Sequence, residues 1–198
     1  MRKYVIMGIQ GSGKGTQSQM LASDLDLAHI SVGDIFRWHV ANHTQMGAQV
    51  RRCLAAGKLV DDDLVQAVIQ RRMAEHDWNF GFVIDGFPRT VAQAGFFMEN
   101  YDVDAVIHLD MPDDEVRARV ASRRPDDVEE ALAVRLRDFH EQTEPAIDLF
   151  RRKEHVITVD ATPARELVQQ QIREKLGLPA VQLAAPAMTG EREKRNGR

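Results

Sequence analysis

Four short runs of β-branched and other apolar residues constrain the fold of this 198-residue chain most strongly. They begin at Tyr4, Gly81, Ala105 and His155, and each closes at a glycine or an aspartate. Nearly continuous apolar character is typical of strands buried on both faces, as in a parallel sheet. A fifth, weaker run begins at Ala28. We therefore expect five parallel strands.

The segments between these runs carry apolar residues three and four positions apart, which indicates helices. The clearest examples are Leu64, Val65, Val68, Ile69 and Met73; Val116 and Val120; and Leu132, Leu136 and Phe139. Alternating strands and helices of this length predict an α/β fold, a doubly wound parallel sheet with helices on both faces. Ligands of such folds bind at the carboxyl ends of the strands.

The chain has 43% hydrophobic residues, enough for one well-buried domain. We expect that domain to span residues 1–177. Within it, residues 33–60 are polar and helix-compatible and are expected to form a small subdomain. Residues 178–198 are rich in alanine and proline and then charged, without amphipathic period, which predicts a disordered tail.

The overall charge and the cysteine count exclude several classes of protein. A net charge of −4 gives no footprint for nucleic acid or membrane. No stretch approaches the roughly 20 apolar residues of a membrane span. Cys53 is the only cysteine, which excludes a disulfide framework and a zinc ribbon. We expect a cytoplasmic monomer.

A glycine-rich loop follows the first strand. Gly8 and the pair Gly13–Lys14 have the spacing G-x-x-x-x-G-K between a predicted strand and a predicted helix, the context in which this motif binds phosphate. Its backbone N–H groups and the helix N-terminus favour anions, and the lysine adds a charge. A dinucleotide motif would need glycine where Thr16 stands. Gly15 occupies the place where many such loops carry a hydroxyl that touches Mg²⁺.

The third strand ends in the sequence D-G-F-P-R-T, which begins at Asp85. Its carboxylate is placed to hold Mg²⁺ through water, and the guanidinium of Arg89 is placed to clamp a monophosphate bidentately. A second interpretation remains open from these residues alone. Asp85 would cap the helix that begins near Thr90, and Arg89 would be solvated.

Arginines cluster further along the chain. Arg119 and Arg123 are four positions apart and share a helix face, Arg124 is next, and Arg135 lies on the following helix. They are either ordinary surface arginines or a group that neutralises phosphate charge, as phosphoryl transfer requires.

Several of these motifs together resemble the adenylate kinase family of nucleoside monophosphate kinases. They are G-K-G-T-Q from Gly13, I-S-V-G-D-I-F-R from Ile30, G-K-L-V-D-D-D-L-V from Gly57, D-G-F-P-R from Asp85 and R-P-D-D from Arg124. The resemblance spans roughly residues 4–176, with the motifs in family order. It implies a P-loop kinase that transfers a phosphoryl group from Mg·ATP to AMP and gives two ADP.

The resemblance also implies roles for individual residues. ATP would be bound by Gly11, Ser12, Gly13, Lys14, Gly15, Thr16, Arg119 and Arg123. AMP would be bound by Val32, Arg37, Lys58, Leu59, Val60, Gly86, Arg89, Gln93, Arg124 and Arg135. The catalytic group would be Lys14, Arg89, Arg123, Arg124 and Arg135, with Asp85 on hydrated Mg²⁺. In the family a threonine stands at the position of Val32, and the glutamine at the position of Gln93 reads adenine.

The family's longer forms insert a mobile domain, sometimes with zinc, between two arginines that adjoin here as Arg123 and Arg124. The chain thus resembles the short form, with a minimal lid at residues 124–127 and no zinc site. Three alternatives remain open from the sequence. They are a UMP/CMP kinase of the same fold, a P-loop kinase for a small metabolite, and a nucleotide-binding regulator without chemistry.

Overall fold

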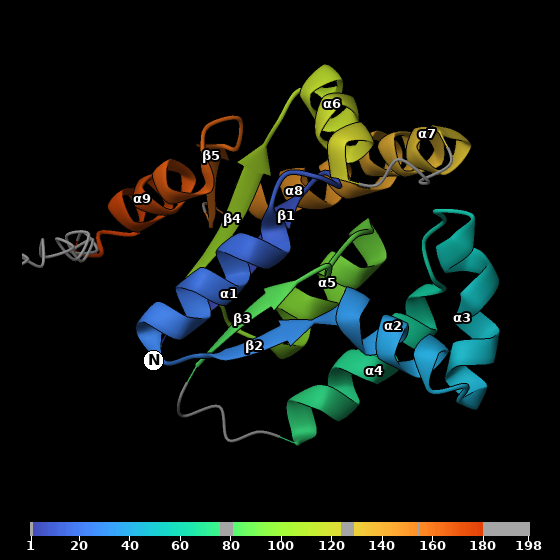
Figure 1. Cartoon of the computed structure of the whole chain (residues 1–198). Helices are drawn as coiled ribbons and strands as arrows, with labels where there is room; N and C mark the ends of the chain where they lie inside the picture. The colour runs from blue at the N-terminus through green and yellow to red at the C-terminus, as the bar shows by residue number, and fades with distance from the viewer. Residues whose placement is uncertain (1, 76–80, 124–128, 154, 180–198) are drawn as a thin grey trace, which may run out of the picture.

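The computed structural model describes residues 2–75, 81–123, 129–153 and 155–179. A five-stranded parallel sheet with the order β2-β3-β1-β4-β5 forms its centre (Figure 1). Its strands are β1 (Lys3–Gly8), β2 (Ala28–Ser31), β3 (Phe82–Asp85), β4 (Ala105–Asp110) and β5 (Val156–Asp160). The predicted doubly wound α/β fold is confirmed, including the weak second strand.

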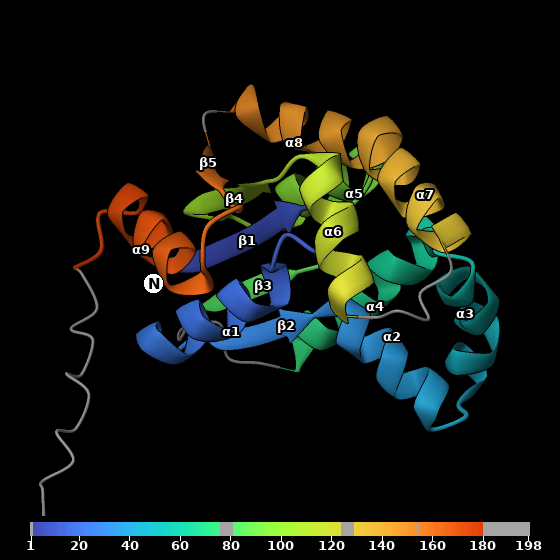
Figure 2. The ribbon, with the colours of Figure 1, turned by 45° about the horizontal axis from the view of Figure 1, so that its top comes forward.

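Helices cover both faces of the sheet (Figures 1 and 2). On one face lie α1 (Lys14–Leu25) and α9 (Arg165–Lys175), and on the other lie α5 (Val91–Asn100) and α8 (Glu144–Arg151). α4 (Asp62–Ala74) packs against α5. This two-sided cover explains why the strands read as continuous apolar runs rather than as alternating ones.

Two pairs of helices stand beyond the carboxyl edge of the sheet (Figure 2). One pair is α2 (Val32–Ala41) and α3 (Gln45–Ala55), within the segment predicted as a small subdomain. The other pair is α6 (Asp113–Arg123) and α7 (Glu129–Asp138). α7 continues through a π-helical turn, η2 (Phe139–Thr143), directly into α8. Because all five strands are parallel, the loops that follow them leave the sheet at this edge, between the two pairs of helices.

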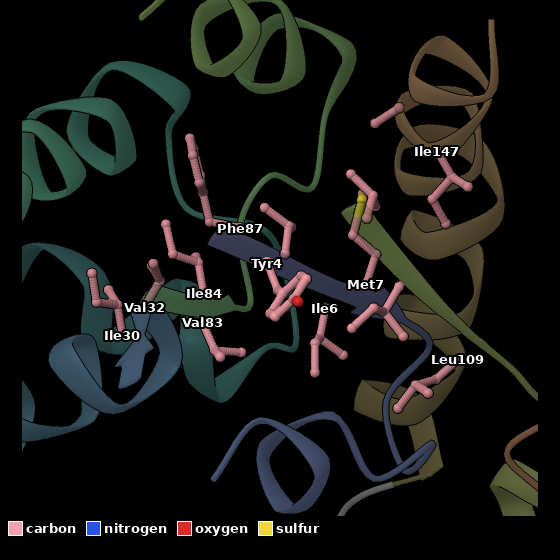
Figure 3. Close-up of a cluster of buried hydrophobic side chains, with 14 of the residues drawn as sticks. Tyr4, Ile6, Met7, Ile30, Val32, Val83, Ile84, Phe87, Leu109 and Ile147 are labelled. Carbon is pink, nitrogen blue, oxygen red and sulfur yellow. The ribbon is translucent and has the colours of Figure 1, made fainter. Parts of the chain in front are cut away.

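The hydrophobic core contains side chains from both faces of the central strands (Figure 3). Successive residues of a strand point to opposite faces. Val5 and Ile6 on β1, and Val83 and Ile84 on β3, are nevertheless all fully buried. The central strands are therefore enclosed on both sides, and their carboxyl ends are held rigidly.

The described chain ends packed against the domain. Arg173 donates from Nε and Nη2 to the carbonyl of Pro179, at 2.9 and 2.7 Å, and from Nη1 to Asp24 at 3.2 Å. Leu178 packs against the core. The predicted tail from residue 180 onward lies outside the described residues. Among the described residues, no helix is long and apolar enough to cross a membrane.

Candidate active site at the carboxyl edge of the sheet

The glycine-rich loop connects β1 to α1 and lies against the end of β4. Gly8 has φ +146°, and a Cβ added there would lie 2.5 Å from the carbonyl oxygen of Leu109. Only glycine fits this close approach. Ser12 is buried and donates to the carbonyl of Ile9 at 2.8 Å. α1 then begins at Lys14, so its N-terminus, the positive end of the helix dipole, opens on the loop.

Lys14 is part-buried, and its Nζ donates to the carbonyl of Ile9 at 2.8 Å. The pKa of Lys14 is lowered to about 7, chiefly by burial and also by the positive charge of Arg89, while the negative charge of Asp85 opposes the shift. An ammonium held with incomplete solvation beside another cation favours a bound anion. The loop, the lysine and the helix start thus have the chemistry of a phosphate site.

Asp85 ends β3 and is buried at the same edge. Its Oδ2 lies 2.8 Å from Nε2 of His29, and its Oδ1 accepts from the hydroxyl of Ser31 at 3.1 Å. Both partners come from β2, whose residue Ser31 is in register with Asp85. A Cβ added to Gly15 would lie 3.9 Å from Oδ2 of Asp85. The carboxylate therefore borders the start of the phosphate helix.

The helix-capping interpretation of Asp85 is wrong. The hydroxyl of Thr90 caps α5 by accepting from the backbone N–H of Gln93 at 3.1 Å.

Three hydrogen bonds hold Arg89 in the turn between β3 and α5. Its Nε donates to the carbonyl of Gly86 at 2.9 Å, and its backbone N–H donates to Oε1 of Gln93 at 2.8 Å. Its own carbonyl accepts from the hydroxyl of Thr143 at 2.9 Å, across from η2. The residue is exposed on the open side of the site. Its guanidinium is therefore oriented by the backbone yet accessible to a ligand.

Two further arginines converge on Arg89. Desolvation by the surrounding protein lowers the pKa of Arg89, the negative charge of Asp85 raises it, and the positive charges of Arg37 and Arg135 lower it. Arg37 reaches there from α2, where its Nε donates to Asp34 at 3.1 Å. Arg135 reaches there from α7. A Cβ added to Gly57 would lie 3.1 Å from both Cγ and Nε of this arginine. Two helices, α2 and α7, and the turn after β3 thus bring three guanidinium groups to one place.

A pocket of about 370 Å³ opens beside this cluster. Its walls include Lys58, Leu59 and Val60, together with Asp62 and Thr90. Val32 and Gln93, which the sequence analysis also assigned to the acceptor, are buried and do not line this pocket. Gln93 adjoins it through its hydrogen bond to Asp62. Val32 lies near Gly86, since a Cβ on that glycine would be 3.9 Å from the Cβ of Val32.

The remaining predicted arginines lie on or after α6. Nη2 of Arg119 donates to the carbonyl of Thr162 at 2.6 Å, in the loop between β5 and α9. Arg123 is the last residue of α6, but its side chain lies outside the described part of the chain, as do Arg124 and the predicted lid at 124–127. These assignments stay predictions.

The described residues include no group of three or more His, Cys, Asp and Glu side chains that could hold a metal ion. Asp85 offers one carboxylate, whose oxygens retain acceptor capacity after their bonds to His29 and Ser31. This donor set fits an ion that keeps its water and is held mainly by phosphates, as Mg²⁺ is in kinases.

The sequence analysis did not find three residues that shape the site. His29 contacts Asp85, Asp62 contacts Thr90 and Gln93, and Thr143 contacts the backbone of Arg89. Of these, only His29 had a usable signal. It lies two residues before Ser31, on the strand that a doubly wound order places beside β3.

Ser31 both caps α2 and donates to Asp85. Its replacement therefore tests how much these two contacts contribute to the stability of the fold. Its Oγ accepts from the N–H of Asp34 at 3.3 Å. We expect Ser31→Ala to lower the free energy of unfolding by about 1–2 kcal/mol, since a helix cap and a hydrogen bond to a carboxylate are lost together. Urea denaturation measures this. Ser23→Ala, at an exposed position on α1, serves as the control; equal values for the two variants would contradict the role.

The family model for adenylate kinase matches residues 6–155. Adenylate kinase 1 of Nostoc sp. is 37% identical over 183 residues, covering 89% of this chain and all of the relative. An adenylate kinase of Treponema denticola is 34% identical over 196 residues, covering 83% of this chain and 94% of the relative. That of Mycobacterium sp. is 36% identical over 181 residues, covering 88% and 99% respectively. The chain belongs to the adenylate kinase family.

Proposed function

We propose that the chain transfers the terminal phosphoryl group of Mg·ATP to the phosphate of AMP, giving two ADP, without a phospho-enzyme. One observation carries the proposal. The phosphate loop after β1 and the Arg89 turn after β3 follow strands that pair directly, in parallel, at one edge of the sheet. A donor and an acceptor phosphate bound there would lie close enough for direct transfer.

The donor site in this proposal is the loop from Gly11 to Thr16. Its backbone N–H groups and the start of α1 surround the phosphates, and Lys14 moves with the transferred group. Arg119 lies beside the ATP base, and its bond to the carbonyl of Thr162 links α6 to the loop before α9. Arg123 is assigned to the same nucleotide by the family pattern.

The acceptor site lies on the other side of Lys14. Arg37, Arg89 and Arg135 bind the monophosphate, Arg124 joins them by the family pattern, and the pocket walled by Lys58, Leu59 and Val60 receives the base. Val32, Gly86 and Gln93 are assigned to the same site by the family pattern, and Gln93 bonds to Asp62 in the pocket wall. Residues 33–60 act as the acceptor subdomain.

The chemistry needs no protein base, because an oxygen of the acceptor phosphate is itself the nucleophile. The residues of the site act by holding two anions in line and by stabilising charge on the transferring group. Mg²⁺ bound with ATP would offset part of the phosphate charge. Asp85, at the end of β3, would hold its water ligands.

A panel of acceptors tests the proposed function. The purified chain is incubated with Mg·ATP and, separately, with AMP, UMP, CMP, GMP or no acceptor, and formation of ADP is followed. Among these acceptors, we expect rapid formation of ADP only with AMP. A preference for UMP or CMP would assign a pyrimidine acceptor, and no ADP with any acceptor would refute the kinase. ADP formed equally without an acceptor would indicate hydrolysis.

Replacing Arg89 tests the acceptor clamp. Arg89→Ala removes a charged, bidentate contact that holds the phosphate before and during transfer. We expect KM for AMP to rise, kcat to fall, and kcat/KM for AMP to fall about 100-fold. KM for ATP should change little. Arg71→Ala, an exposed arginine on α4 paired only with Glu75 in the described structure, is the matched control. An unchanged kcat/KM for AMP would remove Arg89 from this role.

The lowered pKa of Lys14 predicts a pH dependence. Only the protonated lysine attracts phosphate, and in the free enzyme it loses its proton as pH rises through about 7. We therefore expect kcat/KM for Mg·ATP to fall about tenfold per pH unit well above that value. Bound phosphates favour the protonated form, so the corresponding fall in kcat should occur at higher pH.

Lys14→Arg is the control for the pH profile. Arginine stays charged throughout the range, so this variant should be slower but should lack the fall that belongs to the lysine. Titration of the nucleotide phosphates themselves affects both enzymes equally. Superimposable profile shapes for the two enzymes would show that Lys14 does not titrate there.

A further inference from the structure

The side-chain amide of Gln93 is held at both of its ends. Gln93 lies in the first turn of α5 and is 2% exposed. Its Nε2 donates to Oδ1 of Asp62 at 2.7 Å, and its Oε1 accepts from the backbone N–H of Arg89 at 2.8 Å. The two partners come from different elements, α4 and the turn after β3. The second contact also helps to hold the backbone of Arg89, whereas the contact with Asp62 does not involve the phosphate clamp.

These two partners have opposite polarity. A carboxylate only accepts hydrogen bonds, and a backbone N–H only donates. If the amide rotated by half a turn, its oxygen would face Asp62 and its NH₂ group would face the N–H of Arg89. Both contacts would then be repulsive in a buried place, where unmade hydrogen bonds cost most. The amide of Gln93 is thus fixed in one direction.

Thr90 holds the carboxylate of Asp62, which in turn fixes the amide of Gln93. Its hydroxyl donates to Oδ2 of Asp62 at 3.0 Å while accepting from the backbone N–H of Gln93 at 3.1 Å. Since that second bond is the cap of α5, the hydroxyl position is set by the helix itself. Asp62 therefore acts from a defined position at the start of α4.

The fixed amide lies directly behind the acceptor pocket, because Gln93 bonds to two residues that line it, Asp62 and Thr90. Lys58, Leu59 and Val60 line the same pocket. An amide nitrogen carries two hydrogens and an amide oxygen accepts twice, so each atom of Gln93 keeps one further bond. What remains for a ligand is one donor and one acceptor, side by side and in a set order.

Purine bases differ in the order of the same two groups. Adenine presents a donor at N6 beside an acceptor at N1, whereas guanine and hypoxanthine present an acceptor at O6 beside a donor at N1. An amide that could rotate would satisfy either edge. We infer that Asp62 is a positioning residue, which fixes the direction of the Gln93 amide and so makes the acceptor site select adenine over 6-oxopurines. This inference rests on the proposed function.

The test compares AMP with IMP, whose hypoxanthine reverses the edge of adenine without adding the 2-amino group of guanine. Asp62→Asn keeps the size and both hydrogen bonds of the side chain, but its amide can turn either its oxygen or its NH₂ group toward Gln93. We expect the ratio of kcat/KM for AMP to that for IMP to fall about tenfold. Asp62→Ala should lower it further.

Asp63→Asn is the matched control, an identical change at the next, exposed position of α4. It should leave the ratio unaltered. Equilibrium binding of AMP and IMP, followed by calorimetry, should show the same change of ratio as the kinetics. Melting temperatures of all variants are measured in parallel, since a purely structural Asp62 would lower stability and would weaken AMP and IMP equally.

The outcomes separate this inference from the proposed function. A wild-type enzyme that makes no ADP from AMP refutes the function itself. A wild-type enzyme that is active on AMP, with an AMP-to-IMP ratio in Asp62→Asn within twofold of wild type, overturns the role of Asp62. A ratio that falls in Asp62→Asn but not in Asp63→Asn supports it.

Discussion

The parallel direction of the strands is the constraint on which the candidate site depends. Because all five strands run the same way, the loops that follow β1, β2 and β3 leave the sheet at one edge. Lys14, Ser31 and Asp85 each come at or just after such a strand end. The site is thus assembled by the topology of the sheet, and buried strands such as β1 hold it in place.

The sequence predicted those parts of the fold and site whose signal is local. The phosphate loop and the Arg89 turn are short strings that follow a strand directly, so the strand pattern also places them. The contacts of His29 with Asp85 and of Asp62 with Gln93 join residues 56 and 31 positions apart. Finding them requires the order of the strands and the packing of α4 on α5, which no single stretch of sequence contains.

The π-helical turn η2 shows the same limit within one helical run. The spacing of Leu132, Leu136 and Phe139 fits an ordinary α-helix, and they are buried as that spacing predicts. The turn that begins at Phe139 is a wider π-helical one, and in it the hydroxyl of Thr143 donates to the carbonyl of Arg89. Such turns occur frequently at functional sites. Here the turn holds the backbone of Arg89 through Thr143. The spacing of apolar residues along the helix does not predict this contact.

The positive charges of the site repel one another when no nucleotide is bound. Arg37 and Arg135 lower the pKa of Arg89, and Arg89 lowers the pKa of Lys14 against the opposing effect of Asp85. In the proposed reaction, a phosphate bound at Arg89 offsets the charge that disfavours protonated Lys14. A phosphate bound at Lys14 stabilises that charge directly. Both substrates therefore favour the protonated form of Lys14, and by linkage this coupling acts in both directions. Without nucleotides, Arg89 disfavours the charged form of Lys14. A nucleotide that relieves this repulsion therefore favours binding of the other.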